Sequence, residues 1–356
     1  MKILRFYALD GLRGIFSLTV LLNHAVQSVT GWSNEGPFRG PHLSVVYFFI
    51  ISGFVLSHSH NKDNNILKYA LYRFARLWPL TVIAMFAMVT IFFINKINGG
   101  YYPGDYVFHW KTWLANVSFL RGMTPHYIEL INEPSWSIGI EFWVSLLIPV
   151  LFLKIGKYAR IAGAVGIFCV LAYSSSAGII STNLNNMFSL MTAIAAMLIG
   201  SGLYTISQSS AFNVSSRPKL WGVLAGISIA ACLYGTYGQP FAKNRLDYLY
   251  IAAFIPLIFV DYMKDENLVK KFLYSKPVQF LGYISFPLYL LHFSVMITGI
   301  TAGDPFWGVV KMTVASIIVA YLYATIIDVK MYRYLKGRIN ALLPDKSPEI
   351  EKSKES

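Results

Sequence analysis

The sequence predicts an all-α protein, built as a polytopic bundle of about ten membrane-spanning helices. Of the 356 residues, 55% are hydrophobic and only 13% are charged, whereas a soluble domain carries roughly 25% charged residues. The mean hydropathy is +0.51, and the apolar residues gather into long runs. A helix of about 17 to 25 apolar residues can cross a bilayer because it satisfies its own backbone hydrogen bonds.

Ten apolar runs have a suitable length for a span. The first run, residues 14–29, has no small-residue cleavage site after it, so we interpret it as a retained span and not as a signal peptide. The predicted spans are residues 12–30, 42–60, 77–97, 136–153, 160–177, 187–206, 219–236, 246–263, 284–300 and 307–327.

Basic residues are distributed unevenly between the connecting segments. The segments on one side of the predicted membrane, including both termini, hold 22 Lys and Arg residues, and the segments on the other side hold 7. Cytoplasmic loops carry an excess of these residues, so the asymmetry predicts that both termini lie in the cytoplasm. It also accounts for the net charge of +13 without a nucleic-acid partner, which we do not expect.

The longest connection, residues 98–135, is predicted to lie outside and could cover a site on the outer face. Its aromatic side chains would either stack on sugar rings or form an interfacial belt; they include Tyr101, Tyr102, Trp110 and Trp113. We divide the chain into a membrane domain, residues 1–335, and a polar cytoplasmic tail, residues 336–356, whose composition favours disorder.

No cluster of residues has the spacing of a metal site. His58 and His60 lie one residue apart, hence on different faces of a helix, which suits interfacial polar residues better than metal ligands. Cys169 and Cys232 both fall in apolar runs, so we expect free thiols.

Ionisable residues inside the first span need a reason, because each costs about 2.5 to 3.5 kcal/mol on insertion scales. This span contains Asp10, Arg13 and His24. Arg13 and His24 are 11 residues apart, which at roughly 100° per residue is within about 20° of three full turns, so their side chains share one face. They are separated by about 16 Å along the axis. The structural alternatives are an arginine that reaches the interface and a histidine that bonds to another helix.

These residues and four later segments resemble the acyltransferase-3 family of integral membrane acyltransferases. Residues 9–14, LDGLRG, followed by His24, are similar to that family's first-helix signature of an arginine, ten residues and a histidine. Residues 48–54, FFIISGF, resemble its second-helix motif.

The other matching segments follow in the family's order. Arg73 and Arg76, before Pro79, resemble its basic motif ahead of the third helix. Residues 136–141, WSIGIE, resemble its Trp-Ser-x-x-x-Glu motif, and residues 285–292, SFPLYLLH, its Tyr-x-x-His region. The resemblance covers residues 1 to about 335. It implies acyl-coenzyme A as the donor, most often a glycan acceptor, and the bacterial inner membrane as the location.

The positions of these residues on the predicted spans can be compared with that implied chemistry. Arg73 and Arg76 are neighbours on one helical face at the cytoplasmic entry to the third span, where guanidinium groups suit the phosphates of a cytosolic donor. Ordinary positive-inside anchoring is the alternative. Ser137 and Glu141 are one turn apart near the outer end of the fourth span, and an unpaired carboxylate there would be disfavoured.

We therefore predict a membrane O-acyltransferase that moves an acyl group, with acetyl favoured by the resemblance, to a glycan hydroxyl. His24 would be the base of a direct transfer, because imidazole titrates near neutral pH, or would itself be acylated first. Glu141 would orient its ring. Arg13, Arg73 and Arg76 would bind the donor phosphates. The remaining residues of the motifs would support the site, with packing or hydrogen bonding as the alternative; they are Asp10, Ser52, Trp136, Ser137, Tyr289 and His292.

Two other functions remain open at this level. One is a transporter whose ionisable residues line a pathway, although the sequence shows no inverted halves with paired broken helices. The other is an acyltransferase with a lipid, peptide or small-molecule acceptor. Neither a permanently bound cofactor nor a metal is expected.

Overall fold

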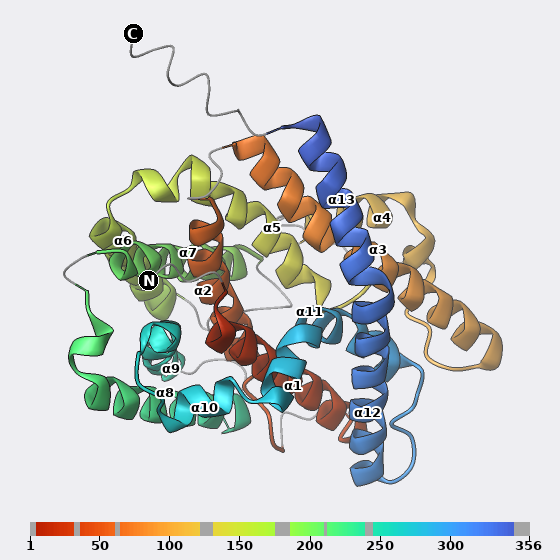
Figure 1. Cartoon of the computed structure of the whole chain (residues 1–356). Helices are drawn as coiled ribbons and strands as arrows, with labels where there is room; N and C mark the ends of the chain where they lie inside the picture. The colour runs from red at the N-terminus through yellow and green to blue at the C-terminus, as the bar shows by residue number, and fades with distance from the viewer. Residues whose placement is uncertain are drawn as a thin grey trace.

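The structure is a computed structural model that describes residues 5–31, 36–60, 65–121, 131–174, 186–209, 212–238 and 245–344. These residues contain helices, turns and irregular segments but no strand, which confirms the all-α class (Figure 1). The α-helices are α1 (Tyr7–Val29), α2 (Pro41–His60), α3 (Ile66–Asn98), α4 (Trp110–Val117), α5 (Ser135–Val150), α6 (Lys157–Ser174), α7 (Asn186–Ser207), α8 (Pro218–Gly238), α9 (Asp247–Phe254), α10 (Leu268–Leu273), α11 (Lys276–Ile297), α12 (Pro305–Tyr323) and α13 (Val329–Leu342).

Seven helical segments of the described chain are long and apolar enough to cross a membrane, so the protein is a membrane protein, but the count of about ten spans is not confirmed. The three other predicted spans correspond to α1, α6 and α9. Helix α1 carries buried polar residues along its length, α6 is described only as far as Ser174, and α9 stops at Phe254 and continues as 3₁₀ turns over Ile255–Tyr262.

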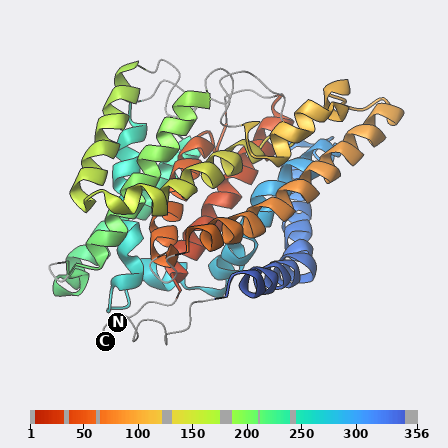
Figure 2. The same cartoon turned by 90° about the horizontal axis from the view of Figure 1, so that it is seen from above.

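Helix α3 is longer than its hydrophobic run predicts. It begins at Ile66, where the Asn65 side chain accepts a hydrogen bond from the Lys68 backbone, and it ends at Gly99 in the left-handed conformation. Its 33 residues would extend about 50 Å, more than the hydrocarbon core of about 30 Å. The far half of α3 and α4 therefore project from the bundle as a pair (Figure 2).

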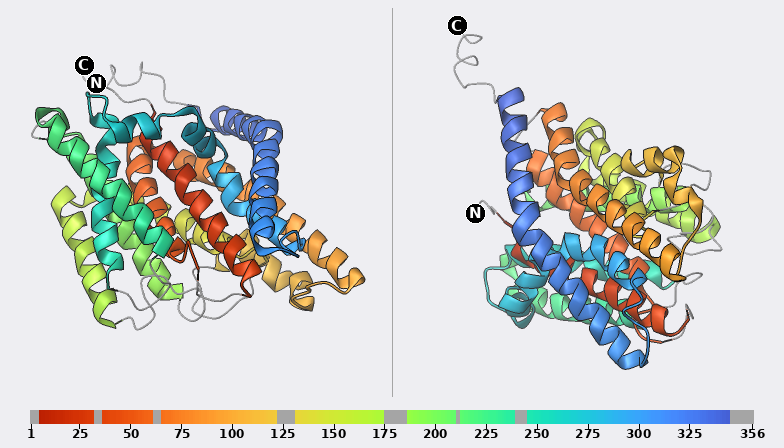
Figure 3. Two further views of the ribbon diagram at one scale, coloured as in Figure 1. Left: turned by 90° about the horizontal axis from the view of Figure 1, so that it is seen from below. Right: turned by 90° about the vertical axis from the view of Figure 1, so that its right-hand side faces the viewer.

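Helix α13 follows α12 through a π-helical turn over Ala324–Asp328. It turns away from α12 and lies across the end of the bundle at which α1 begins (Figure 3, left). Ile339 is buried and the Tyr72 hydroxyl donates a hydrogen bond to Asn340, so α13 packs on the beginning of α3. Residues 336–342, which we assigned to the polar tail, are therefore helical; residues 345–356 lie outside the described chain.

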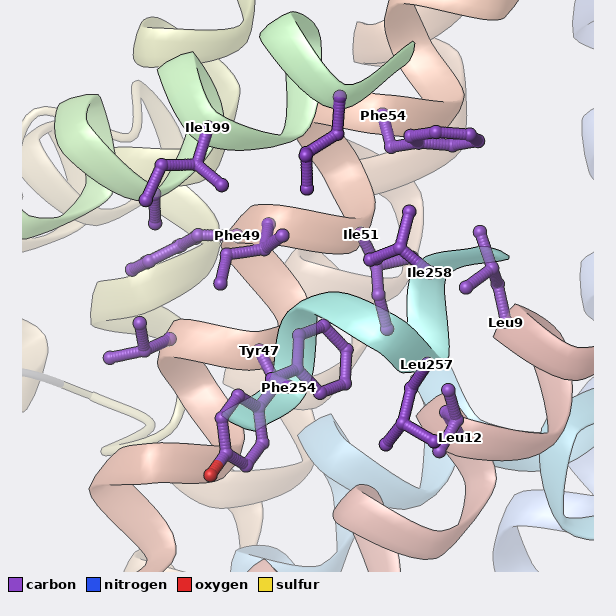
Figure 4. Packing of buried hydrophobic residues seen from close by; sticks show 14 of the residues in the cluster. Leu9, Leu12, Tyr47, Phe49, Ile51, Phe54, Ile199, Phe254, Leu257 and Ile258 are labelled. Atoms are coloured by element: carbon purple, nitrogen blue, oxygen red, sulfur yellow. The ribbon is translucent and has the colours of Figure 1, made fainter. Parts of the chain in front are cut away.

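The largest hydrophobic cluster surrounds α2, which is buried along most of its length. Leu9 and Leu12 of α1, Ile199 of α7 and Phe254 of α9 approach α2 from different sides (Figure 4). Tyr47 and Phe254 stack with ring centroids 4.5 Å apart. Because α2 is apolar on all sides, it forms the centre of one half of the protein.

Two backbone contacts fix the helices that carry the predicted motifs. A Cβ atom on Gly14 of α1 would lie 2.4 Å from the backbone nitrogen of Gly282 on α11, and a Cβ on Gly53 of α2 would lie 2.3 Å from the Met197 carbonyl oxygen on α7. Only glycine permits such close approach, which is typical of helix contacts in membranes. The first contact sets the position of α1 relative to α11.

Candidate active site

A cavity of about 180 Å³ lies between α1, α2, α3, α5 and α11. Eight of the eleven residues that the sequence nominated line it: Asp10, Arg13, Ser52, Arg73, Arg76, Ser137, Glu141 and Tyr289. The structure thus brings together residues that are as much as 279 positions apart in the chain. His24, Trp136 and His292 are not among the lining residues.

The directions of the helices give the cavity two distinct ends. Helices α1 and α2 are antiparallel, because Phe6 contacts Phe54 and Thr19 contacts Ser44. Helices α3 and α5 are also antiparallel, because Tyr69 donates to the Ser145 carbonyl oxygen whereas Arg73 donates to Glu141. Helices α1 and α11 run in the same direction from Gly14 and Gly282 onward. The lining residues therefore fall into a basic end, formed by Arg13, Arg73 and Arg76, and a hydroxyl end, formed by Ser137 and Tyr289.

At the basic end, Arg73 is held in a hydrogen-bonded ion pair. Its Nη2 lies 2.7 Å from Oε1 of Glu141, and its Nε donates to the Ser145 hydroxyl at 3.2 Å. The Ser52 hydroxyl donates to the same Glu141 oxygen at 2.9 Å. Both charged side chains are almost buried, at 11% and 13% exposure. Such a pair joins α2, α3 and α5, and removing one partner would leave a buried charge uncompensated.

Arg76 is also paired, but at a more open position. Its Nη1 lies 2.6 Å from Oδ2 of Asp328, in the π-helical turn before α13. The guanidinium lies over the rings of Phe286 and Tyr332, at 5.4 and 5.6 Å from the centroids. Helix α13 therefore contacts Arg76 through Tyr332, although none of its described residues lines the cavity.

Arg13 differs from both. Among the described residues, its side chain has no hydrogen bond and no ion pair, although it lines the cavity and is only partly exposed. The neighbouring Asp10 instead accepts a hydrogen bond from Arg5 at 2.8 Å. An unpaired cation in a site of low dielectric is costly, and the cost falls when an anion enters the cavity.

The hydroxyl end is closed by a polar pair set among apolar side chains. The Tyr289 and Ser137 hydroxyls are 2.8 Å apart, and the Tyr289 ring packs edge-on against Phe48 with centroids 5.6 Å apart. Ile138 and Leu77 also line this end. Tyr289 is the outermost lining residue on α11, and His292 lies about one turn beyond it.

Just beyond the hydroxyl end, His24 and His292 form a hydrogen-bonded pair. Nδ1 of His24 lies 2.8 Å from Nε2 of His292, and Nδ1 of His292 lies 2.9 Å from the Leu288 carbonyl oxygen. His292 is fully buried, whereas His24 keeps partial exposure and packs edge-on against Phe293. The His24 ring therefore packs on α11.

Two nominated residues have surroundings other than those we expected. We expected Glu141 beside His24, but its carboxylate accepts from Arg73 and Ser52, and His292 is the hydrogen-bonding partner of His24. Trp136 is partly buried and packs against the hydrophobic cluster around α2, outside the cavity lining.

Some residues of the site escaped the sequence reasoning. Asp328 directly follows the last apolar run, and an acidic residue at the end of a span is expected to pair with a basic residue. Its pairing could therefore have been predicted from the sequence. Ser145 and Phe48 gave no comparable signal, because serine and phenylalanine are common in membrane helices. The aromatic segment after α3 packs on α3 itself: the Trp113 ring contacts Phe86 and the Tyr101 ring contacts Phe92. Residues 122–130 lie outside the described chain.

Comparisons with known proteins bear on the class of this site. The acyltransferase domain of the acyltransferase-3 family matches residues 6–325. "Protein 2 in picA locus" of Rhizobium radiobacter is 30% identical over 156 residues, which cover 40% of this chain and 79% of that protein. Acyltransferase MdmB of Streptomyces mycarofaciens is 27% identical over 165 residues, 44% of this chain and 41% of MdmB.

A third relative aligns over more of the chain. YrhL of Bacillus subtilis (strain 168), provisionally assigned as a peptidoglycan O-acetyltransferase, is 23% identical over 348 residues. These cover 88% of this chain and 53% of YrhL, so the chain spans about half the length of YrhL, and less of MdmB. No solved structure matches the chain.

Proposed function

Because this chain belongs to the acyltransferase-3 family and is an acyltransferase of the membrane, we propose that it transfers an acetyl group from cytosolic acetyl-coenzyme A to a hydroxyl of a cell-envelope or exported glycan. The proposal is carried by the order of groups along one axis: a guanidinium with no ion pair among the described residues, a cavity, a pair of hydroxyls and then a pair of imidazoles. Each group matches one part of an acyl-coenzyme A donor or one step of acyl transfer.

The basic end receives the donor phosphates. Arg13 supplies a cation that has no partner among the described residues, and Arg73 and Arg76 add two more held in place by Glu141 and Asp328. Planar guanidinium groups bind phosphate oxygens in a bidentate manner. We place this end at the cytoplasmic side of the bacterial inner membrane, with both termini in the cytoplasm, since the positive-inside asymmetry favours it.

The pantetheine arm then extends along the cavity toward the hydroxyl end. Arg13 and His24 are on one continuous helix and are separated by about 16 Å along its axis, which suits an extended pantetheine. Polar groups along this path can hydrogen-bond its amides; they are Ser17, Ser52, Ser137 and Tyr289. The thioester would lie beside Tyr289, one turn before the imidazole pair.

His24 acts as the general base in the transfer step. Its imidazole takes the proton of the acceptor hydroxyl, and the oxygen attacks the thioester carbonyl carbon. The carbon–sulfur bond breaks, the coenzyme A thiolate leaves, and the proton on His24 passes to the thiolate. The products are the acetyl ester and free coenzyme A. The glycan reaches His24 from the outer side, where α1 ends.

The test compares the wild-type protein with His24→Ala. Mass spectrometry of envelope and exported glycans, from cells with and without each protein, measures acetyl ester content. The exposed His109, which precedes α4 and lies outside the cavity, provides the matched control His109→Ala. We expect acetylation with the wild type and the control, and none with His24→Ala at equal membrane abundance.

Two results would contradict the proposal. Full acetylation with His24→Ala would remove the base role. An unchanged glycan profile in all strains, together with altered solute uptake, would favour a transporter over the enzyme.

A further inference from the structure

The histidine pair has a direction, which the Leu288 carbonyl determines. A carbonyl oxygen only accepts hydrogen bonds, so Nδ1 of His292, 2.9 Å away, must carry the proton. In a neutral imidazole the other nitrogen then has a lone pair. Nε2 of His292 is therefore an acceptor, and Nδ1 of His24, 2.8 Å from it, must be the donor.

We infer that His292 is a positioning residue that fixes His24 in the tautomer protonated on Nδ1, so that the lone pair of Nε2 is the base. This inference rests on the proposed role of His24. The Leu288 carbonyl oxygen determines which nitrogen of His292 is protonated, and His292 in turn determines the tautomer of His24. Among the described residues, no carboxylate takes part in this series of hydrogen bonds. Orienting a reactive imidazole through its second nitrogen is a general device in histidine sites.

The geometry of the two rings supports a true in-plane hydrogen bond. Their planes differ by only 13° and their centroids are 5.1 Å apart. The 2.8 Å between the bonded nitrogens is shorter than the centroid separation by about the two centroid-to-nitrogen distances of the rings. Both nitrogens therefore lie on the line between the centroids, and the rings meet edge to edge and not face to face. Phe293 packs edge-on against His24 at 5.6 Å between centroids and restricts rotation of its ring.

The other possible arrangements are unfavourable. If Nε2 of a neutral His292 carried the proton, the lone pair of Nδ1 would face the Leu288 oxygen at hydrogen-bonding distance, and both would be left unsatisfied. If both nitrogens carried protons, a fully buried cation would lie beside another imidazole, with no carboxylate bonded to it among the described residues.

The arrangement also helps the transfer step. When Nε2 of His24 takes the proton of the acceptor hydroxyl, the ring becomes cationic while its Nδ1 proton still points at the lone pair of His292. A hydrogen bond from a charged donor is roughly twice as strong as a neutral one, so the His292 pair stabilises the transition state more than the resting state. The effect is expected in kcat and not in donor affinity.

Two variants of the purified protein separate this role from simple packing. His292→Gln keeps an amide oxygen near the position of Nε2 and can accept from His24, whereas His292→Leu has a similar bulk and no acceptor. We expect His292→Leu to lower kcat about 10- to 100-fold with KM for acetyl-coenzyme A changed by less than about threefold, and His292→Gln to restore most of kcat. Equal kcat values for the two variants would overturn the inference, as would a loss confined to KM.

His24→Ala distinguishes a failure of this inference from a failure of the proposed function. If that variant keeps its activity, the base role itself is wrong. If it is inactive while His292→Leu matches the wild type, the base role stands and the tautomer role fails.

Nuclear magnetic resonance tests the tautomer of His24 without any substitution at His292. In protein labelled with ¹⁵N in its histidines, the His24 signals are identified by their loss in His24→Ala. We expect the nitrogen shifts of a ring protonated on Nδ1 and unprotonated on Nε2. The opposite tautomer in the resting protein would overturn the inference.

Discussion

Arg13 offers a sharp test of the donor site, because it lines the cavity with no ion-pair partner among the described residues, whereas Arg73 is paired with Glu141. We expect Arg13→Met to weaken coenzyme A binding by the loss of one charged hydrogen-bonded contact, about 1.5–3 kcal/mol. That corresponds to about 10- to 140-fold in Kd, since about 1.4 kcal/mol is tenfold. The fold should be unharmed or slightly stabilised, because no ion pair is broken and a buried charge is removed.

Arg73→Met is the matched comparison. Among the described residues, it leaves the 13%-exposed Glu141 carboxylate hydrogen-bonded to the Ser52 hydroxyl alone, and removing one partner of a buried pair costs about 3–5 kcal/mol. Titration calorimetry with coenzyme A and thermal unfolding in the same detergent measure both quantities. Binding by Arg13→Met equal to that of the wild type would refute the reasoning, and so would an unfolding temperature lowered as far as that of Arg73→Met.

Three further predictions follow from the walls of the cavity. Phe48→Ala removes the ring that packs against Tyr289 at the hydroxyl end and so leaves more room for a longer acyl chain. The ratio of kcat/KM for hexanoyl-coenzyme A to that for acetyl-coenzyme A should rise at least about tenfold. An unchanged ratio would show that another residue limits acyl length. Gly14→Ala places a Cβ 2.4 Å from the backbone of α11 and should separate the histidine pair, with most of the transferase activity lost. Gly163→Ala is the control and should behave as the wild type, because its Cβ would have no described atom within 4 Å outside its own helix backbone. Equal activities of the two variants would count against this helix contact. Asp328→Asn releases Arg76 from a partly exposed ion pair that contributes about 0–1 kcal/mol. Calorimetry should therefore show coenzyme A binding that is unchanged or up to about fivefold tighter. Weaker binding would mean that Asp328 helps to hold the donor.

The features that could be predicted from the sequence are those set within one helix. The 11-residue spacing of Arg13 and His24 follows from helical periodicity alone, and the apolar runs identified the helical class because a bilayer demands them. The ends of helices were less accessible. Helix α3 starts at Ile66 because Asn65 caps it, although the hydrophobic run that marks the span begins 11 residues later.

The pairings between helices could not be read from the sequence. Whether His24 meets Glu141 or His292 depends on how far α1 is displaced along α11, and a backbone contact between Gly14 and Gly282 decides this. The spacing of residues within one helix carries no information about how far that helix is displaced along another. The same applies to Asp328, which reaches Arg76 only because α12 continues through a π-helical turn into α13.

Helix α1 is continuous from Tyr7 to Val29 and contains no proline. Arg13, which we propose binds the phosphates, and His24, the proposed base, are thus on one continuous helix. The distance between them sets the length of donor that can contact both. A truncated thioester that lacks the nucleotide can contact Arg13 or His24 but not both. We therefore expect a thioester to reach the imidazole only when its nucleotide phosphates and its acyl group are about as far apart as Arg13 and His24.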